Sequence, residues 1–198
     1  MSENITNRFS NLESGQKRKL EEYIENLMEY NKKLNIMSRK IGKRDIEKLI
    51  EETMLLEKLI TNSTIIDVGS GNGILGIPIA IMNKQKEIKL VESKVRKASF
   101  LGLVIRNILL KNVEVYNLDI KEYLKKKLEK RFTLIARGFP RNEILYDFIR
   151  KGFAQELVII TSKNKIKKNK KNLENMNKNI YNIFFRDNLV ILKIKGFT

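Results

Sequence analysis

Apolar residues follow a helical spacing over the first third of the chain. From about Gln16 to Leu34 and from about Asp45 to Ile60 they recur every three or four positions, as on one face of an amphipathic helix. The two predicted apolar faces contain Leu20, Tyr23, Ile24, Leu27, Met28 and Leu34, and then Ile46, Leu49, Ile50, Met54, Leu55 and Leu59. We therefore expect an N-terminal helical extension over residues 1–62, joined in one compact unit to a second domain over residues 63–198.

Beyond residue 62, short apolar runs alternate with helical segments. The pattern predicts strands over 64–67, 88–92, 113–118, 132–136 and 156–161, and helices over 73–82, 94–110, 121–129 and 141–151. Strands that alternate with helices are typical of a parallel sheet, because each crossover returns the chain to the same edge. Two last runs, 180–185 and 189–194, flank a short polar turn and predict an antiparallel hairpin. The fold class is therefore α/β, with a mostly parallel seven-stranded sheet.

The junction after the strand at 64–67 carries three glycines at alternate positions. Glycine adopts backbone conformations closed to other residues and lets N–H groups approach a ligand closely. In the dinucleotide fingerprint the third glycine stands three residues after the second, a place that Ile74 holds here, so the spacing argues against NAD or FAD. An acid before the glycines would repel a diphosphate but suits the cationic amino end of S-adenosyl-L-methionine. The predicted cofactor-binding residues are Asp67, Gly69, Ser70, Gly71 and Gly73.

A second acid strengthens this interpretation. The strand-like run Ile88 to Val91 ends in Glu92, 19 residues beyond Gly73, and an acidic residue at a spacing of about 20 accepts a hydrogen bond from a ribose hydroxyl. Two alternatives stay open from the residues alone. In the first, the glycines mark only a plain turn between a strand and a helix. In the second, Glu92 is a surface acid that closes a strand.

The charge balance indicates a polyanionic partner. The chain carries 40 Lys and Arg against 23 Asp and Glu, a formal net charge of +17, with basic runs at 121–131 and 163–178. Such a balance favours nucleic acid through phosphate contacts and counterion release. The alternative is a solvated lysine-rich surface, produced by the codon bias of a genome rich in A and T. The stretch 163–179 is poor in apolar residues and predicts a loop or a frayed helix.

Residue types that are absent narrow the chemistry. With no cysteine and no histidine, a disulfide, a thiolate nucleophile and a structural zinc are excluded, and we expect no metal. Neither a secretion signal nor an apolar run of about 18 residues is present, so we expect a cytoplasmic protein.

The motifs, taken in order over roughly residues 18–195, resemble the RsmG or GidB family of bacterial 16S ribosomal RNA guanine-N7 methyltransferases. The most specific stretch, residues 67–81, is close to the family's Asp-Val-Gly-Ser-Gly-x-Gly-x-Pro-Gly-Ile-Pro-Leu-Ala-Ile. Residues 30–38 resemble its Trp-Asn-x-x-x-Asn-Leu-Thr-Ser, and Glu52-Thr53 stands where it has Asp-Ser. Glu92-Ser93 resembles another Asp-Ser pair, and Ala136-Arg137-Gly138 matches its Ser/Ala-Arg-Ala.

The resemblance implies a Rossmann-like class I methyltransferase fold with S-adenosyl-L-methionine as cofactor. It implies methyl transfer to N7 of a guanine in 16S ribosomal RNA, in the 530 stem loop of the decoding centre. The expected partner is this RNA, or the 30S subunit or its precursor, and we expect a monomer without membrane contact. Besides the residues above, the resemblance places Ser93, Ile74, Ile120, Lys121 and Arg137 at the cofactor or target pocket.

Several positions depart from the family pattern. The family's histidine is Leu49 here, and its Arg-x-Glu after the third strand is Asp119-Ile120-Lys121. Its lysine after the fifth strand falls near Ser162, with Lys163 one residue away. Arg131 or Phe132 replaces the acid of its Phe-Asp pair. These departures motivate one alternative, a non-catalytic RNA-binding or ribosome-assembly module on a methyltransferase fold. A methyltransferase with another substrate is a further alternative, because it fits the glycine-rich loop equally well.

The residues present permit guanine N7 methylation. This nitrogen carries a lone pair and no proton, so catalysis needs positioning and electrostatic stabilisation rather than a general base. Cytosine C5 methylation needs a thiolate, which the chain lacks. Adenine amino methylation usually uses Asp/Asn-Pro-Pro-Tyr/Phe, where this chain has Ala136 to Pro140. Arg137 is the predicted catalytic residue, since its fork binds a phosphate, the base O6 or a carboxylate. Its alternative is packing over the end of the sheet against a surface acid.

The predicted RNA contacts lie around the same loops: Asn31, Asn35, Arg96, Lys97, Phe139 and Lys163. Phe139 would stack on an extruded base or belong to the core. Arg96 and Lys97 would reach phosphates beside the cofactor. Asn31 and Asn35 close the first helix, where capping of backbone groups by Asn35 or Ser38 is the favoured alternative.

Overall fold

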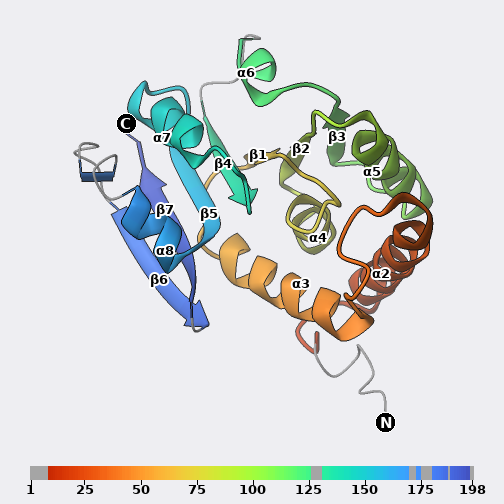
Figure 1. Ribbon diagram of the computed structural model, residues 1–198. Helices are drawn as coiled ribbons and strands as arrows, with labels where there is room; N and C mark the ends of the chain where they lie inside the picture. The colour runs from red at the N-terminus through yellow and green to blue at the C-terminus, as the bar shows by residue number, and fades with distance from the viewer. Residues whose placement is uncertain (1–8, 126–130, 170–172, 175–179, 187, 197–198) are drawn as a thin grey trace.

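The computed structural model describes residues 9–125, 131–169, 173–174, 180–186 and 188–196. Its centre is a seven-stranded sheet in the order β3-β2-β1-β4-β5-β7-β6 (Figure 1). The strands are β1 Thr64–Val68, β2 Glu87–Val91, β3 Val113–Tyr116, β4 Phe132–Arg137, β5 Glu156–Ser162, β6 Ile180–Arg186 and β7 Leu189–Lys195. β1 to β5 pair in parallel, and β7 lies antiparallel between β5 and β6. The predicted parallel sheet with a C-terminal antiparallel hairpin is confirmed.

Helices cover both faces of this sheet (Figure 1). They are α2 Ser14–Leu34, α3 Lys43–Glu57, α4 Gly76–Met82, α5 Val95–Asn107, α6 Ile120–Tyr123, α7 Asn142–Arg150 and α8 Lys163–Lys168. Alternate residues of β1 point to opposite faces, so Ile65 packs in one core and Ile66 in the other. The first core contains residues of α2 to α5 and the second contains residues of α6 and α7. The two N-terminal helices therefore share a core with the sheet.

Several element boundaries differ from the sequence predictions, and two predicted segments lie partly outside the described residues. α4 begins at Gly76 instead of residue 73, because residues 73–75 continue the glycine-rich loop. α6 ends at Tyr123, and much of the predicted helix 121–129 lies outside the described residues. In the lysine-rich stretch, α8 is helical over Lys163–Lys168, while 170–172 and 175–179 lie outside the described part. Among the described residues, no helix combines the length and apolarity needed to span a membrane.

Candidate functional site

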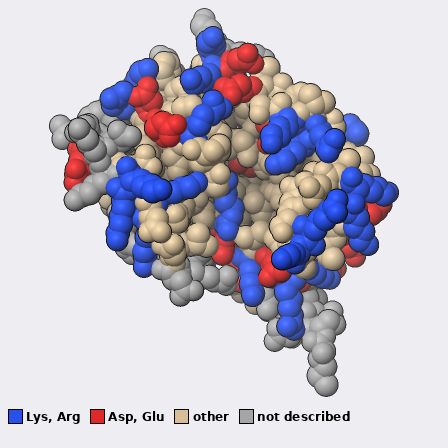
Figure 2. All heavy atoms as spheres, in the orientation of Figure 1, with Lys and Arg blue, Asp and Glu red and all other residues tan. Residues whose placement is uncertain are grey.

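The carboxyl ends of β1, β2 and β4 open into a cavity of about 520 Å³. Ligands of parallel α/β sheets bind at this end, where strand order reverses and loops diverge. Figure 2 shows the hollow on this face with Lys and Arg side chains around it. The wall contains residues from the glycine-rich loop, from the segment after β2, from the segment after β4, and from α3 and the segment before it: Asp67, Gly69, Ser70, Gly71, Asn72, Ile74, Leu75; Glu92, Ser93, Lys94, Lys97; Arg137, Gly138, Phe139, Pro140; and Ile36, Met37, Ile41, Leu49.

The glycine-rich loop needs its glycines. Gly69, Gly71 and Gly73 have φ values of 65°, 62° and 83°, in the left-handed region that residues with a Cβ rarely adopt. A Cβ on Gly73 would also lie 2.5 Å from Cδ1 of Ile77. The backbone N–H of Gly69 donates to the carbonyl of Val91 at 2.8 Å, which holds the loop against β2. The loop is therefore a fixed, narrow turn with its backbone at the cavity wall.

Asp67 lies beneath this loop. Its residue is 2% exposed, and its Oδ2 accepts the N–H of Gly76 at 3.1 Å, at the beginning of α4. Burial raises the pKa of this carboxyl to about 7; the Gly76 hydrogen bond opposes the rise and the charge of Glu92 adds to it. A cationic group in the cavity would favour the ionised form, so Asp67 is suited to an ammonium ligand near neutral pH.

Glu92 joins the glycine-rich loop to the beginning of α5. Its Oε2 accepts the N–H of Gly71 at 2.9 Å and its Oε1 accepts the N–H of Lys94 at 2.8 Å. The residue is 5% exposed, so the alternative of a surface acid is wrong. Each carboxylate oxygen has capacity for a second hydrogen bond, which suits a ribose diol. Asn117, after β3, supports the segment by donating to the carbonyls of Glu92 at 2.8 Å and Ser93 at 3.1 Å.

Arg137 stands at the end of β4 and forms an ion pair with α3. Its Nη1 lies 2.6 Å from Oε2 of Glu52, whose residue is 4% exposed. The acid is therefore buried next to a residue of the cavity wall and is not the surface acid of the alternative interpretation. Sequence reasoning assigned no role to Glu52. The available signal was its place in the Glu52-Thr53 pair, which matches the family's Asp-Ser.

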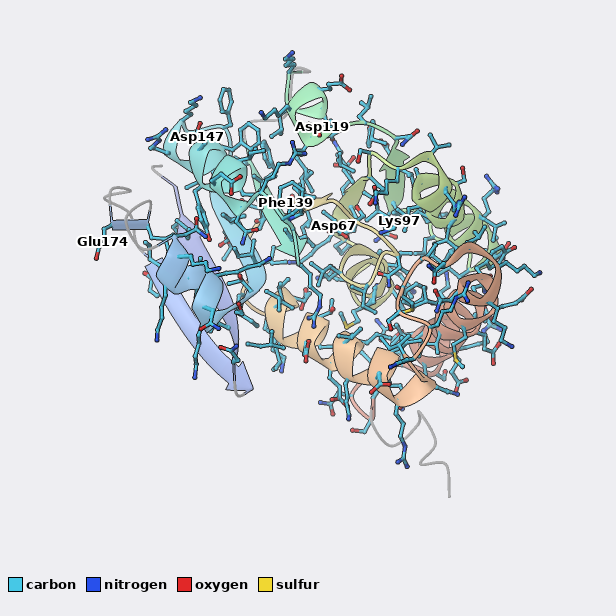
Figure 3. All side chains as sticks on the ribbon, in the orientation of Figure 1. Asp67, Lys97, Asp119, Phe139, Asp147 and Glu174 are labelled. Atoms are coloured by element: carbon cyan, nitrogen blue, oxygen red, sulfur yellow. The ribbon has the colours of Figure 1, made fainter. Side chains whose placement is uncertain are left out.

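Phe139 packs against the glycine-rich loop at Gly69, and both residues line the cavity. A Cβ on Gly69 would lie 3.0 Å from the ring, which is half-buried and also packs against the second core. The structure thus gives this ring both a core contact and a place in the cavity wall. Behind it, Arg141 pairs with Asp119 at 2.9 Å and lies 5.9 Å from the ring centre. Figure 3 shows Asp67, Phe139 and Lys97 arranged around the centre of the molecule.

The N-terminal helices hold the glycine-rich loop from the opposite side. The hydroxyl of Tyr23 on α2 donates to the carbonyl of Asn72 at 3.1 Å. The hydroxyl of Thr53 on α3 is 2.9 Å from the carbonyl of Ile74. Both side chains are fully buried. Sequence reasoning had placed Tyr23 only on an apolar helix face, so the extension contributes to the site more directly than expected.

Three predicted cofactor residues are not part of the cavity wall, and one of them, Gly73, belongs to the glycine-rich loop. Ile120 is buried in the second core and Lys121 is exposed at the beginning of α6. Asp119 caps this helix by accepting the N–H of Lys121 at 2.9 Å. This bond and the Arg141 guanidinium lower the pKa of Asp119. The cofactor contacts of Ile120 and Lys121 stay predictions.

The predicted RNA residues fall into two groups. Lys97 lines the cavity, and Arg96 and Lys163 are exposed at the beginnings of α5 and α8, at the same end of the sheet. Asn31 is 8% exposed and binds the chain's own backbone, while Asn35 ends α2 in the left-handed conformation with its N–H donating to the carbonyl of Asn31. The capping interpretation of Asn35 is confirmed, and the RNA contacts stay predictions. Among the described residues, no cluster of acidic side chains could hold a metal ion.

Comparison with known proteins agrees with the motifs. The model of the family described as GidB: rRNA small subunit methyltransferase G matches residues 16–192. A Ribosomal RNA small subunit methyltransferase G of Brachyspira hyodysenteriae is 33% identical over 184 residues, which cover 91% of this chain and 88% of that protein. The protein of the same name from Pelagibacter ubique is 34% identical over 152 residues, covering 72% and 70%. The protein of this name from Fusobacterium nucleatum is 34% identical over 128 residues, which cover 64% of this chain. The match spans about half of the Fusobacterium protein's length, 55%.

Solved structures with low sequence identity share the fold. The METTL16 MTase domain superposes with a TM-score of 0.65 at 14% identity, covering 91% of this chain and 81% of that one. The precorrin-6y C5,15-methyltransferase of Geobacter metallireducens gives 0.60 at 16% identity, covering 81% and 92%. The fold is thus that of the class I S-adenosyl-L-methionine-dependent methyltransferases, as expected. Because the family model matches residues 16–192, most of this chain, the chain belongs to the GidB family of rRNA small subunit methyltransferases G.

Proposed function

We propose that this protein transfers a methyl group from S-adenosyl-L-methionine to N7 of a guanine in 16S ribosomal RNA. The guanine that the family resemblance implies lies in the 530 stem loop of the decoding centre. The observation that carries the proposal is the cavity, where the glycine-rich loop, Glu92 and the Arg137 segment meet at the carboxyl ends of the strands. The partner is this RNA or the 30S subunit, and the protein acts as a cytoplasmic monomer.

The residues at the wall fit the cofactor. The left-handed glycines leave a surface without Cβ atoms that a nucleoside can approach. Glu92 would accept from the ribose hydroxyls, with Ser93 beside it, and Asp67 would face the ammonium group; all three residues line the cavity. When bound, the cofactor supplies a methyl group activated on a sulfonium sulfur.

Arg137 and Phe139 would position the target base. The Glu52 carboxylate fixes the guanidinium at the cavity wall, and a guanidinium carries five N–H donors, more than one carboxylate takes. The remaining donors would bind the base O6 or a phosphate. Phe139 would stack on the extruded guanine, as enzymes that modify a base in structured RNA must unstack it. Since N7 has no proton to lose, holding the two reactants in line is the main task of these side chains.

Cationic residues around the cavity would bind the RNA backbone. Lys94 and Lys97 line the wall, and Arg96 and Lys163 begin helices at the same end of the sheet. Phosphate contacts of this kind add affinity and fix orientation without reading sequence. Specificity would then come from the cavity and from the surfaces beside it.

The test is methyl transfer in vitro. Labelled S-adenosyl-L-methionine is incubated with the protein and with small ribosomal subunits, or their extracted RNA, from cells lacking this gene, and the RNA is digested to nucleosides. We expect label in 7-methylguanosine. Label in another nucleoside would overturn the N7 assignment. Cofactor binding without transfer to either substrate would favour another target, and absence of cofactor binding would favour a non-catalytic RNA-binding module.

A further inference from the structure

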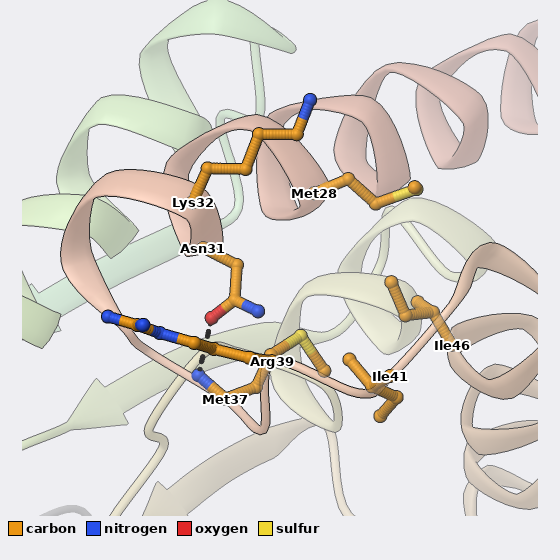
Figure 4. A pocket seen from close by; sticks show the side chains of 7 residues that line it. All are labelled: Met28, Asn31, Lys32, Met37, Arg39, Ile41 and Ile46. Carbon is orange, nitrogen blue, oxygen red and sulfur yellow. Dashed lines mark hydrogen bonds between the residues drawn. The ribbon is translucent and has the colours of Figure 1, made fainter.

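A second pocket, of about 390 Å³, lies where α2 ends and α3 begins (Figure 4). We name it the α2–α3 pocket, and it is lined by Met28, Asn31, Lys32, Met37, Arg39, Ile41 and Ile46. We propose that it binds one nucleotide of the substrate RNA next to the methylated guanine, with the base in the pocket and its phosphate between two cationic side chains. The inference rests on the proposed function and adds a specificity subsite to it.

The pocket adjoins the main cavity. Met37 and Ile41 line both, so these two side chains form a shared wall. An RNA strand that places one base in the cavity can therefore place an adjacent nucleotide against this wall. The pocket volume also falls within the range of about 300–1,000 Å³ typical of small-molecule sites. Its position and its size both suit a single nucleotide.

The walls of the pocket favour a flat aromatic ring. They present the thioethers of Met28 and Met37 and the side chains of Ile41 and Ile46. Methionine sulfur makes favourable contacts with aromatic rings and adapts to ligands of different shape. Met28 is 36% exposed although it lies on the apolar side of α2, so its side chain is available to a ligand. A nucleobase would cover this exposed apolar surface.

Cationic side chains stand at two sides of the same pocket. Lys32 extends from α2 and Arg39 from the segment between the helices (Figure 4), and both residues are exposed. A phosphate is the anion that a nucleotide carries beside its base, and a guanidinium fork matches its oxygens. Apolar walls with two cations at the edge therefore match a nucleotide better than they match an apolar peptide anchor.

Asn31 holds the pocket in shape. Its Oδ1 accepts the backbone N–H of Met37 at 2.9 Å, drawn as the dashed line in Figure 4, and its Nδ2 donates to the carbonyl of Ser38 at 3.3 Å. These bonds fix the segment that carries the shared wall. Asn31 is thus a positioning residue of the subsite, and the wall is formed before RNA binds.

The base contact is tested by a double-mutant cycle between protein and RNA. The substrate is a small-subunit rRNA fragment containing the guanosine that receives the methyl group, with an abasic nucleotide introduced in turn at each flanking position. We expect one abasic position to raise KM about tenfold with kcat retained, since one stacked base contributes on this scale. Met28→Ala should raise KM similarly and remove the effect of that abasic position. The control is Leu55→Ala, an exposed apolar residue of α3 outside both pockets.

The phosphate contact is tested by equilibrium binding of the same fragment at low salt. Lys32→Ala and Arg39→Ala should each weaken binding several-fold. Lys33 is the sequence neighbour of Lys32, and Lys40 is the neighbour of Arg39; both are exposed and lie outside the pocket. Lys33→Ala and Lys40→Ala are therefore matched controls that remove the same charge. Met28→Ala should leave S-adenosylhomocysteine binding unchanged.

The outcomes separate the subsite from the reaction. One outcome is normal transfer to N7 in which Met28→Ala and each abasic position affect KM additively. Another is normal transfer in which the Lys32 and Arg39 variants bind RNA as their controls do. Either outcome would overturn the subsite and leave the proposed function intact. Absence of 7-methylguanosine with the binding difference preserved would overturn the reaction and support the nucleotide pocket. Effects seen with assembled subunits but not with naked RNA would indicate a ribosomal protein as occupant and would overturn the nucleotide assignment.

Discussion

At the scale of single residues, the site depends on an ion pair that motifs did not reveal. Removal of Arg137 leaves the buried Glu52 carboxylate without its 2.6 Å partner. Breaking a buried ion pair by removing one partner typically costs about 3–5 kcal/mol of folding free energy. We therefore expect Arg137→Ala to lose methyl transfer and also to lower the free energy of unfolding, measured by urea denaturation.

A conservative variant separates catalysis from stability. Arg137→Lys keeps a positive charge beside Glu52 but lacks the planar fork. We expect Arg137→Lys to fold with most of the wild-type stability and to lose at least tenfold in kcat. Stability and kcat both at wild-type values in this variant would contradict the assigned role of the guanidinium.

Asp67 gives the site a pH dependence. Its pKa is raised to about 7 from 3.8, so between these values the folded protein keeps a proton that the unfolded chain has lost. Its contribution to stability is fully present below pH 3.8 and is lost as pH rises through 7, with a total of roughly 4 kcal/mol. Asp67→Asn has no such titration. Urea denaturation across pH 4–7 should therefore show the variant gaining stability relative to the wild type.

Cofactor affinity should rise with pH, whereas the stability contribution of Asp67 falls. As pH rises from 5.5 to 7.5, Asp67 ionises and its attraction for the ligand's ammonium group increases. We expect the affinity for S-adenosylhomocysteine, measured by calorimetry, to rise over this range in the wild type and to stay level in Asp67→Asn. Equal pH dependence in the two proteins would contradict the placement of the ammonium group at Asp67.

At the scale of elements, α2 and α3 stabilise the cofactor loop. Tyr23 and Thr53 each donate a hydrogen bond to a carbonyl of the loop, and loss of a buried bond costs about 1 kcal/mol or somewhat more. Tyr23→Phe and Thr53→Val should therefore weaken S-adenosylhomocysteine binding about five- to tenfold. Tyr146→Phe is the matched control, since Tyr146 is also buried but lies on α7, outside the cavity wall. A control variant that weakens binding equally would contradict a specific role of the helices.

Local patterns were sufficient to predict most elements and part of the site. The alternation of strand and helix patterns predicts the sheet, and three glycines with Glu92 predict the cofactor loop, because these signals lie within short segments. The beginning of α4 was misplaced because nothing local indicates that Asp67 accepts the N–H of Gly76. The pairs Arg137–Glu52 and Tyr23–Asn72 join segments far apart in the sequence. Such pairs follow from packing of the helices on the sheet, which no single segment encodes.

At the scale of the whole molecule, charge should govern RNA affinity. The net charge is +17, and α8 places exposed lysines at the same end of the sheet as the cavity. Each phosphate contact adds about 0.7–0.9 to the slope of log K against log salt. We expect Lys165→Gln with Lys168→Gln to reduce this slope for small-subunit rRNA by about one to two and to leave S-adenosylhomocysteine binding unchanged.

The control pair for this experiment lies at the opposite end of the sheet. Lys84 precedes β2 and Lys111 precedes β3, so both are near the amino ends of the strands, and both are exposed. Lys84→Gln with Lys111→Gln removes the same charge. An equal reduction of the slope in this pair would show that affinity follows net charge and not the placement of α8.

The most direct test of the central claim is the position of the methyl group in cells. 16S rRNA from a strain lacking this gene, with and without the gene restored, is reduced with borohydride and cleaved with aniline, which breaks the chain at 7-methylguanosine. We predict a break at one guanosine of the 530 stem loop that appears when the wild-type gene is restored and is weaker with Arg137→Lys. An identical cleavage pattern with and without the gene would contradict the account.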